Sequence, residues 1–235
     1  MVIKSKLLIM INMFFIYLSR IYTKTIRKMD TNSYIAMFHD IVEDEKQQDE
    51  YSVTRKEFAN YIASLVHSGW NFSGSPPTVR KKSIQLTFDD GFSSVYHTAY
   101  PILKKHGIPF TVFITVDYIG TDGYMTWENI TELCNSGLCR IGSHTLSHPL
   151  FRFLTLRQKT EELCRSKERI EKFIHTEVTD FAFPYGSFYA VDYKSRKLAK
   201  KYYQNVYTTT GICLHSNQSC YPRINVPFYR KKHLK

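Results

Sequence analysis

The sequence predicts an α/β protein, because short apolar runs alternate with helical stretches along most of its length. Seven runs of strand length follow residue 33, at positions 34–38, 83–88, 109–115, 140–143, 180–183, 205–208 and 223–226. Strand–helix–strand order repeated this often is typical of parallel strands joined by helical crossovers. We therefore expect a parallel sheet or barrel covered by helices.

Five helical stretches separate these runs, at positions 54–67, 94–106, 126–135, 155–174 and 188–201. Thr54 and Glu57 begin the first of them with the spacing of a capping box, which satisfies the free N–H groups of a first helical turn. Thr155 and Gln158 begin another in the same way. Both signals fix where a helix starts.

Composition and charge exclude several classes of protein. The chain has 235 residues, 43% hydrophobic and 15% aromatic, which suffices for one substantial core and argues against disorder. Of its formal net charge of +11, residues 1–30 carry +5 and the last six residues +4, so that residues 31–229 carry +2. Nucleic-acid binding needs a basic surface on the folded body, so we predict no nucleic-acid partner. Basic ends suit an anionic membrane surface better.

Residues 1–30 are expected to form an amphipathic helix on a membrane surface, separate from a second domain at 31–235. Apolar residues recur there at helical spacing, and polar and basic ones occupy the other side. No small-residue cleavage site follows the apolar run at 7–18, and most positive charge lies after it. A helix packed on the second domain and an uncleaved export signal are the alternatives. We favour the cytoplasmic face of a membrane over export.

The first motif with chemical content is LTFDDG, at residues 86–91, which places Asp89 and Asp90 side by side after a predicted strand. Adjacent carboxylates repel one another unless a bound cation or a proton neutralises the charge of one of them. The carboxyl ends of parallel strands are also where α/β proteins hold their sites. A plain strand-to-turn junction is the alternative interpretation.

The second motif is SHTLSHP, at residues 143–149. His144 and His148 are four residues apart, a spacing that can direct two imidazoles at one metal ion. Pro149 and the lack of helical periodicity place them in a loop or a single turn. No Glu follows His144, so this is not the HExxH motif of metalloproteases. Two unrelated surface histidines are the alternative.

The third motif, FAFPYGSF at residues 181–188, is an apolar strand that ends in a Pro-Tyr-Gly turn and by itself predicts only that turn. The order of the three motifs is more informative. TFDDG, HTxxHP and PYG, each after a predicted strand, resemble the NodB-homology polysaccharide deacetylases, carbohydrate esterase family 4. The resemblance covers residues 34–226, and its first two motifs are specific.

This resemblance implies an irregular (β/α) barrel of about seven parallel strands. It also implies that Asp90, His144 and His148 bind a divalent metal, usually zinc. Asp89 would then be the catalytic base, and the turn at Tyr185 would line the acetyl pocket. A cation held by two neutral imidazoles and one carboxylate keeps a positive charge and open positions, so it can polarise an amide and activate water. We expect the metal and the Tyr185 backbone N–H to stabilise the resulting oxyanion.

The leaving amine needs a proton from a group with a pKa near neutrality, which indicates a histidine. Family members often carry it in a Leu-x-His motif near the C-terminus, but the nearest candidate, His215 in GICLHSNQ, misses that spacing. His39 in YIAMFHD is similar to the N-terminal histidine of the poly-N-acetylglucosamine deacetylase branch, whose barrel order is circularly shifted. We expect His39 to be the acid; His215 and the absence of a dedicated histidine stay open.

A second departure concerns an arginine that many relatives carry two residues before the Pro of the PYG turn, where it orients the base. Ala182 occupies that position here. Arg223, in the last predicted strand, is our candidate for the missing charge, and a surface salt bridge is the alternative.

The sequence therefore predicts a metal-dependent hydrolase that removes N-acetyl groups from N-acetylhexosamine units of a polysaccharide or glycan precursor. Two alternatives stay open. One is a hydrolase of a non-sugar amide or an O-acetyl ester on the same fold. The other, of a different class, is a catalytically silent glycan-binding domain.

Overall fold

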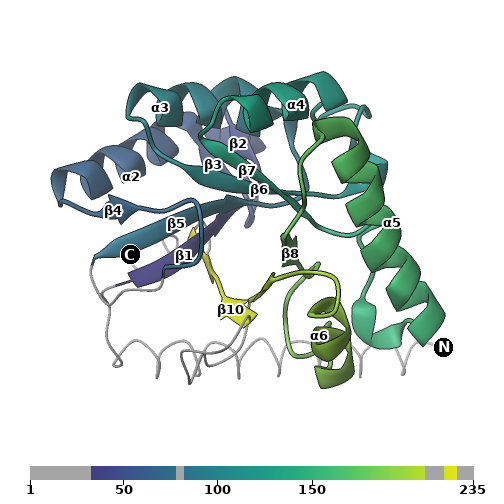
Figure 1. Ribbon diagram of the computed structural model, residues 1–235. Coiled ribbons are helices and arrows are strands. Elements are labelled where there is room, and N and C mark those ends of the chain that lie inside the picture. Colours follow the sequence, from purple (N-terminus) through teal and green to yellow (C-terminus); the bar gives the residue numbers. More distant parts are fainter. Residues whose placement is uncertain (1–32, 78–81, 210–219, 227–235) are drawn as a thin grey trace.

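The computed structural model describes residues 33–77, 82–209 and 220–226, and its main sheet consists of parallel strands (Figure 1). Eight strands follow one another in the order β10-β9-β8-β7-β6-β5-β1-β11, and β4 also pairs with β5. Their bounds are β1 Ser33–Phe38, β4 Asn71–Phe72, β5 Ser83–Phe88, β6 Phe110–Ile114, β7 Cys139–Ser143, β8 Asp180–Ala182, β9 Asn205–Thr208, β10 Cys220–Pro222 and β11 Ile224–Asn225. The predicted α/β class and parallel strands are confirmed.

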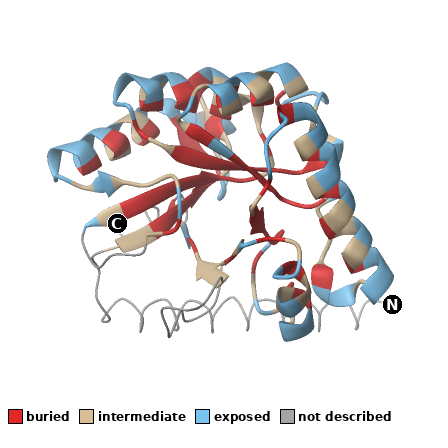
Figure 2. Cartoon of the chain, in the orientation of Figure 1, coloured by how far each residue is buried: buried red, intermediate tan, exposed pale blue. Residues whose placement is uncertain are grey.

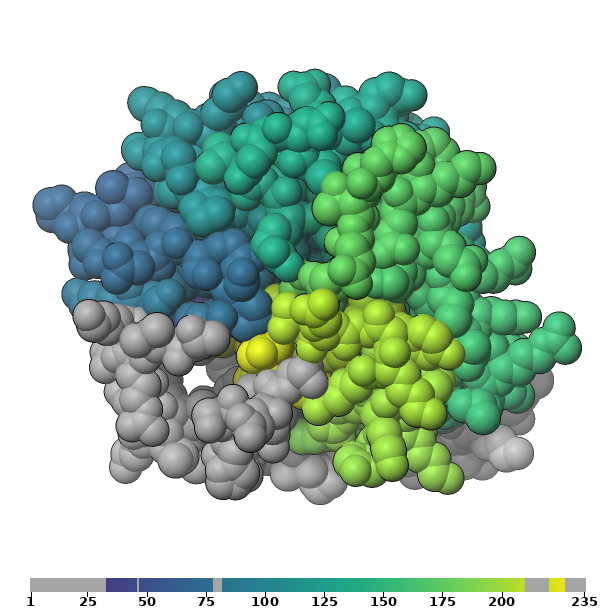
Figure 3. Space-filling view, viewed as in Figure 1, coloured from purple at the N-terminus to yellow at the C-terminus, as the bar shows by residue number. Residues whose placement is uncertain are grey.

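The sheet curls into a nearly closed barrel, and one short segment joins its two edges. β10 pairs with β9 at one edge, and β11 pairs with β1 at the other. Only Arg223 lies between β10 and β11 in the chain. In the space-filling view, residues 220–226 show as a small yellow area between the blue and the yellow-green segments (Figure 3). The closing segment thus brings Arg223 beside strands from both halves of the chain.

Helices cover the outside of this barrel, and their exposed faces point away from it (Figures 1 and 2). They are α2 Arg55–His67, α3 Tyr100–Lys105, α4 Trp127–Asn135, α5 Leu156–Ile174 and α6 Tyr193–Ala199. Capping boxes begin α2 at Thr54 and α5 at Thr155, as the sequence predicts. Single helical turns cover Glu45–Gln47, Val116–Tyr118 and Phe151–Phe153, and a small second sheet pairs β2 (Ile41–Val42) with β3 (Val53–Thr54).

Two of the expected helices differ from the structure. The helix expected at 94–106 is divided into a π-helical stretch, Val95–Ala99, and α3, because Pro101 has no N–H to continue the ladder. The helix expected at 188–201 begins only at Tyr193. The Asp192 side chain accepts a hydrogen bond from the Ser195 backbone N–H at 2.6 Å, which sets the start of α6 there.

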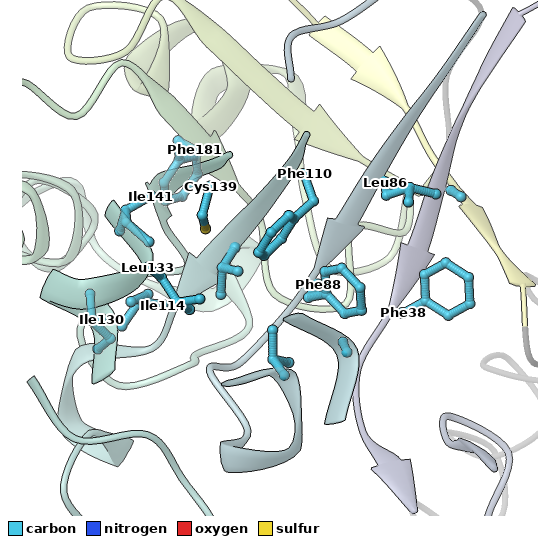
Figure 4. Close-up of a cluster of buried hydrophobic side chains, with 14 of the residues drawn as sticks. Phe38, Leu86, Phe88, Phe110, Ile114, Ile130, Leu133, Cys139, Ile141 and Phe181 are labelled. Atoms are coloured by element: carbon cyan, nitrogen blue, oxygen red, sulfur yellow. The ribbon is translucent and has the colours of Figure 1, made fainter. Parts of the chain in front are cut away.

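Apolar packing occupies mainly the outer face of the barrel, between strands and helices. Figure 4 shows part of this core, in which Phe88 and Phe110 of adjacent strands belong to the same cluster as Ile130 and Leu133 of α4. The inside of the barrel is different. Gln85 of β5 donates hydrogen bonds to Thr111 of β6 and, across the barrel, to Tyr207 of β9. The interior thus contains buried polar side chains beside a small apolar cluster of Ile35, Phe113, Ala182 and Tyr207.

No helix in the described part of the chain is long and apolar enough to cross a bilayer. The expected amphipathic helix at residues 1–30 lies outside the described residues, as does His215. The membrane surface as a partner, and the division at residue 30, therefore remain predictions from the sequence.

Candidate active site

The chain bends sharply after β5, β7 and β8, and these bends carry most of the motif residues. Among the described residues, five non-glycine residues have positive φ angles, and four of them lie at these strand ends: Asp90, Thr145, His148 and Tyr185. A side chain in this conformation is strained and persists only where the surrounding structure holds it. Strain gathered at one end of the barrel indicates a functional site there.

Asp90, His144 and His148 come together at this end. One ligand atom from each lies within 4.8 Å of the others. Asp90 Oδ1 is 3.3 Å from His148 Nε2 and 3.6 Å from His144 Nε2. His144 Nδ1 is 2.8 Å from the Ala182 carbonyl oxygen. That contact fixes the proton on Nδ1 and leaves the Nε2 lone pair for a ligand.

The electrostatics of these three side chains suit a cation. Burial, and then the charge of Asp89, raise the pKa of Asp90 to about 7, and its buried Oδ1 has no hydrogen-bond partner among the described residues. Burial lowers the pKa of His144 to about 3, so the ring is neutral, as a metal ligand must be. Two neutral imidazoles and one carboxylate with an unsatisfied oxygen match a catalytic zinc site. The residues present fit the implied metal.

Asp89 points into the barrel and is bound by Arg223. The guanidinium donates from Nη1 to Asp89 Oδ1 at 2.5 Å and from Nη2 to Oδ2 at 2.7 Å. Burial by itself raises the pKa of Asp89, but the charge and hydrogen bonds of Arg223, together with His144, lower it to about 2. Asp89 is therefore ionised at neutral pH and held in one orientation.

Arg223 is itself buried, with 3% of its surface exposed, which excludes the surface salt bridge. Its guanidinium also donates to the Thr87 hydroxyl at 3.3 Å and lies 5.1 Å from the centre of the Phe113 ring. An aromatic face and a carboxylate stabilise a desolvated guanidinium. Arg223 supplies the positive charge that Ala182 lacks, and it comes from the segment between β10 and β11 rather than from β8.

His39 follows β1 and faces the same centre. Its Nδ1 is buried with no hydrogen-bond partner among the described residues, and its ring packs edge-on against Tyr51 with centroids 5.4 Å apart. Burial lowers the pKa of His39, and the charge of Asp89 raises it in opposition. The structure thus places an unpaired imidazole near the carboxylate that is the candidate base.

Tyr185 lies at the rim, with 57% of its surface exposed and its ring centroid 4.9 Å from that of His148. Its carbonyl oxygen accepts a hydrogen bond from the Thr209 hydroxyl at 3.0 Å. The next residue, Gly186, has φ +57°, and a Cβ there would lie 2.5 Å from the Thr209 nitrogen. Only glycine fits, so the PYG turn fixes the Tyr185 backbone beside the two histidines.

Sequence reasoning missed three further tyrosines around this centre: Tyr51, Tyr118 and Tyr124. Tyr118 packs 6.1 Å from His148, and Tyr51 packs on His39. The negative charge of Asp90 raises the pKa of both Tyr118 and Tyr124, beyond the effect of burial. The only sequence signal for them was the presence of aromatic residues in a loop after a predicted strand. The sequence of a loop does not by itself predict where the loop lies relative to the site.

Residues 77–206 match the sequence profile of the polysaccharide deacetylase family, and the chain belongs to this family. A poly-β-1,6-N-acetyl-D-glucosamine N-deacetylase of Staphylococcus epidermidis is 26% identical over 188 residues, which are 70% of this chain and 63% of that protein. A polysaccharide deacetylase from Bacillus cereus has a TM-score of 0.71 at 26% identity, covering 83% of this chain and 64% of that one.

IcaB from Ammonifex degensii shares the fold, with a TM-score of 0.71 at 24% identity over 82% of this chain and 91% of that chain. The barrel expected from the motifs is therefore the barrel of known deacetylases. The chain spans about half to two thirds of the length of the curated relatives it matches.

Proposed function

We propose that this chain is a metal-dependent N-deacetylase that removes acetyl groups from N-acetylhexosamine units of a polysaccharide or glycan precursor. The observation that carries the proposal is the convergence of Asp90, His144 and His148 within 4.8 Å, next to a separately held Asp89. Relatives named as deacetylases of poly-β-1,6-N-acetyl-D-glucosamine favour that glycan as the substrate.

Asp90, His144 and His148 would hold the metal, for which zinc is our candidate. When bound, such an ion supplies a positive charge that polarises the acetamide carbonyl and lowers the pKa of water. Asp89 stays ionised and is fixed by Arg223, so it can accept the proton of the attacking water. Arg223 acts through Asp89 and is a positioning residue.

His39 and Tyr185 complete the reaction. The amine leaves only when it receives a proton, and the protonated form of His39 is our candidate donor, since the charge of Asp89 opposes the lowering of its pKa by burial. The Tyr185 backbone N–H is our candidate for stabilising the negative charge that develops on the acetyl oxygen. Each step then has one side chain or backbone group of this chain assigned to it.

Release of acetate from a β-1,6-linked N-acetylglucosamine oligosaccharide tests the proposal. We expect the wild-type chain to release acetate when zinc is supplied and to stop when a chelator is added. Asp89→Asn is expected to reduce the rate at least 10²-fold, which is the low end of a general base's contribution. It should still bind the oligosaccharide.

Two outcomes separate the alternatives. If the zinc-loaded wild type binds the oligosaccharide and releases no acetate from it, the domain is a binding module. If acetate comes only from O-acetyl esters or non-sugar amides, the fold and metal site stand and the substrate class is wrong.

A further inference from the structure

Three aromatic rings form a series that leads toward the candidate metal ligands. Phe92 and Tyr124 are stacked, with centroids 4.9 Å apart and an angle of 21° between their planes. Tyr124 then contacts Tyr118 at 4.8 Å, and Tyr118 lies 6.1 Å from His148. All three aromatic residues are half-buried, so part of each remains open to solvent. The series leads from Phe92, which packs partly against the hydrophobic core, to His148 of the candidate metal site.

The loop at residues 115–125, which carries both tyrosines, is fixed to the turn after β5. The Met125 backbone N–H donates to the Gly91 carbonyl at 2.9 Å, and the Ser93 N–H donates to the Gly123 carbonyl at 2.9 Å. A Cβ at Gly91 would lie 3.0 Å from Ile119, so glycine permits this close approach. Gly91 directly follows Asp90, and the loop therefore shares its anchor with a candidate metal ligand.

The same loop is fixed to the turn after β7. The Val116 N–H donates to the Thr145 carbonyl at 3.2 Å, and the Asp117 N–H donates to the Leu146 carbonyl at 2.9 Å. Thr145 directly follows His144. Backbone hydrogen bonds to both metal-binding turns hold Tyr118 and Tyr124 at a set distance from the site. A surface that is ordered before a ligand arrives loses little entropy on binding.

We propose that Tyr118 and Tyr124, supported by Phe92, form a stacking platform for the sugar next to the unit that is deacetylated. This inference rests on the proposed function and specifies its substrate as a glycan chain of at least two units. A pyranose ring presents C–H groups on its faces and hydroxyl groups at its edge. An aromatic ring with a phenolic hydroxyl matches both, because its face is apolar and its tip forms hydrogen bonds.

The platform makes a prediction about which kinetic constant changes. Contacts to a remote sugar that do not strain the substrate act equally in the ground state and the transition state. Such contacts change KM rather than kcat. Removing the platform should therefore reduce the preference for a long substrate over a short one. It should leave the pH profile of the reaction in place, because neither tyrosine transfers a proton.

The test compares the zinc-loaded wild type with Tyr118→Leu and Tyr124→Leu on two substrates. One is a β-1,6-linked N-acetylglucosamine pentasaccharide, and the other is the methyl glycoside of N-acetylglucosamine. We expect the ratio of kcat/KM for the pentasaccharide to kcat/KM for the monosaccharide to fall about tenfold in each variant, through KM. Tyr118→Phe should restore most of the ratio. Tyr193→Leu, at a tyrosine that is 74% exposed on α6, is the matched control.

An unchanged ratio in both variants, or an equal loss on both substrates, overturns the platform. A second measurement does not depend on catalysis: calorimetric titration of the pentasaccharide into zinc-loaded Asp89→Asn, with and without Tyr118→Leu. We expect the added change to weaken binding about tenfold; unchanged binding overturns the inference.

If the wild type releases no acetate, the proposed function fails, and this titration still decides whether the platform binds the sugar. Thermal unfolding of each variant identifies any that fail to fold.

Discussion

The two ends of the barrel each hold a buried charged network, and the two networks are completed in opposite ways. Toward the amino ends of the strands, the Asp180 carboxylate accepts hydrogen bonds from Arg140 at 2.6 Å, Tyr207 at 3.0 Å and Asn205 at 3.1 Å. Gln85 extends this network to Thr111, although its own Oε1 has no hydrogen-bond partner among the described residues. Each donor comes from the chain itself, so this end needs no ligand to satisfy its carboxylate.

At the carboxyl ends of the strands, polar atoms are buried without partners. Asp90 Oδ1 and His39 Nδ1 have no hydrogen bond among the described residues, although both sit beside other ionisable groups. A buried group left unsatisfied costs free energy of folding. The comparison teaches that the chain itself satisfies the Asp180 carboxylate at one end, whereas at the other end the Asp90 carboxylate keeps a buried oxygen without a partner among the described residues, where a ligand could bind.

Replacing the arginine at each end of the barrel should give the largest effects, on kcat at one end and on stability at the other. Arg223→Met removes the guanidinium that fixes Asp89, and we expect kcat to fall about 10³-fold, in the range of a lost general base. Zinc content should not change, because Arg223 touches no candidate ligand. Arg140→Met removes the ion pair to Asp180 and should lower stability while kcat stays near wild type. Steady-state acetate release and bound zinc check both variants.

The comparison fails if Arg223→Met keeps its rate, or if Arg140→Met loses rate without losing stability. In either case, the two arginines would not divide function and stability between the two ends.

Asp90 should make the metal-free protein less stable as pH rises. Its pKa of about 7 in the folded protein lies above the ordinary 3.8. Folding therefore favours the protonated form; this contribution is complete below pH 3.8 and is lost as pH rises through 7. At 1.36 kcal/mol per pKa unit, the loss is on the order of 4 kcal/mol. Asp90→Asn does not titrate, so metal-free Asp90→Asn should be more stable than wild type at pH 8, by urea unfolding.

Asp89 gives the opposite sign in a separate window. Its folded pKa of about 2 lies below 3.8, so its contribution is present above pH 3.8 and is lost as pH falls toward 2. A stability profile of the metal-free protein that rises steadily from pH 4 to pH 8 would contradict the assignment for Asp90.

Removing the Asp180 carboxylate at the amino end should destabilise the protein, in contrast to the stabilisation expected for metal-free Asp90→Asn. Asp180 has 1% of its side chain exposed and accepts hydrogen bonds from four other residues. Asp180→Ala leaves these donors unpaired, and we expect a loss of about 3 kcal/mol in the free energy of unfolding. Urea denaturation at pH 7 measures it. A neutral or stabilising result would mean that the amino-end network is not a stabilising one.

The smallest expected effect is at Thr111, whose hydroxyl accepts a hydrogen bond from Gln85 at 3.0 Å and donates one to the Gly74 carbonyl at 3.2 Å. Thr111→Val keeps the side-chain shape and removes both bonds, so it should lower stability by about 1 kcal/mol. We expect the rate of acetate release to stay within twofold of wild type. A large loss of rate would show that the two ends are coupled.

The sequence predicted seven of the parallel strands, because each of those is a short apolar run, and it predicted the starts of two helices from their capping boxes. It missed β10 at Cys220–Pro222, a three-residue, half-buried strand whose conformation depends on pairing with β9. It also placed the start of α6 too early, since Asp192 outweighs the helical character of the residues before it. The local sequence pattern therefore predicts where long elements lie, whereas the existence and bounds of short ones depend on tertiary contacts.

The site follows the same division. Asp90, His144 and His148 were predicted from the order of three motifs that resembles the polysaccharide deacetylases, and the parallel strands that carry these motifs end on the same side of the sheet. Arg223 was a hypothesis from a missing charge, and only the closing segment of the barrel brings it to Asp89, 134 residues away in the chain. Tyr118 and Tyr124 could not be placed, since their loop is positioned by hydrogen bonds to two distant turns.

The central claim is that three side chains hold a metal while Asp89 stays out of its coordination. Zinc bound per chain, measured by mass spectrometry after dialysis, tests this claim directly in wild type, Asp89→Asn and His148→Gln. We predict one equivalent in wild type and in Asp89→Asn, and a loss of most of it in His148→Gln. Full zinc in His148→Gln, or none in Asp89→Asn, would contradict the account.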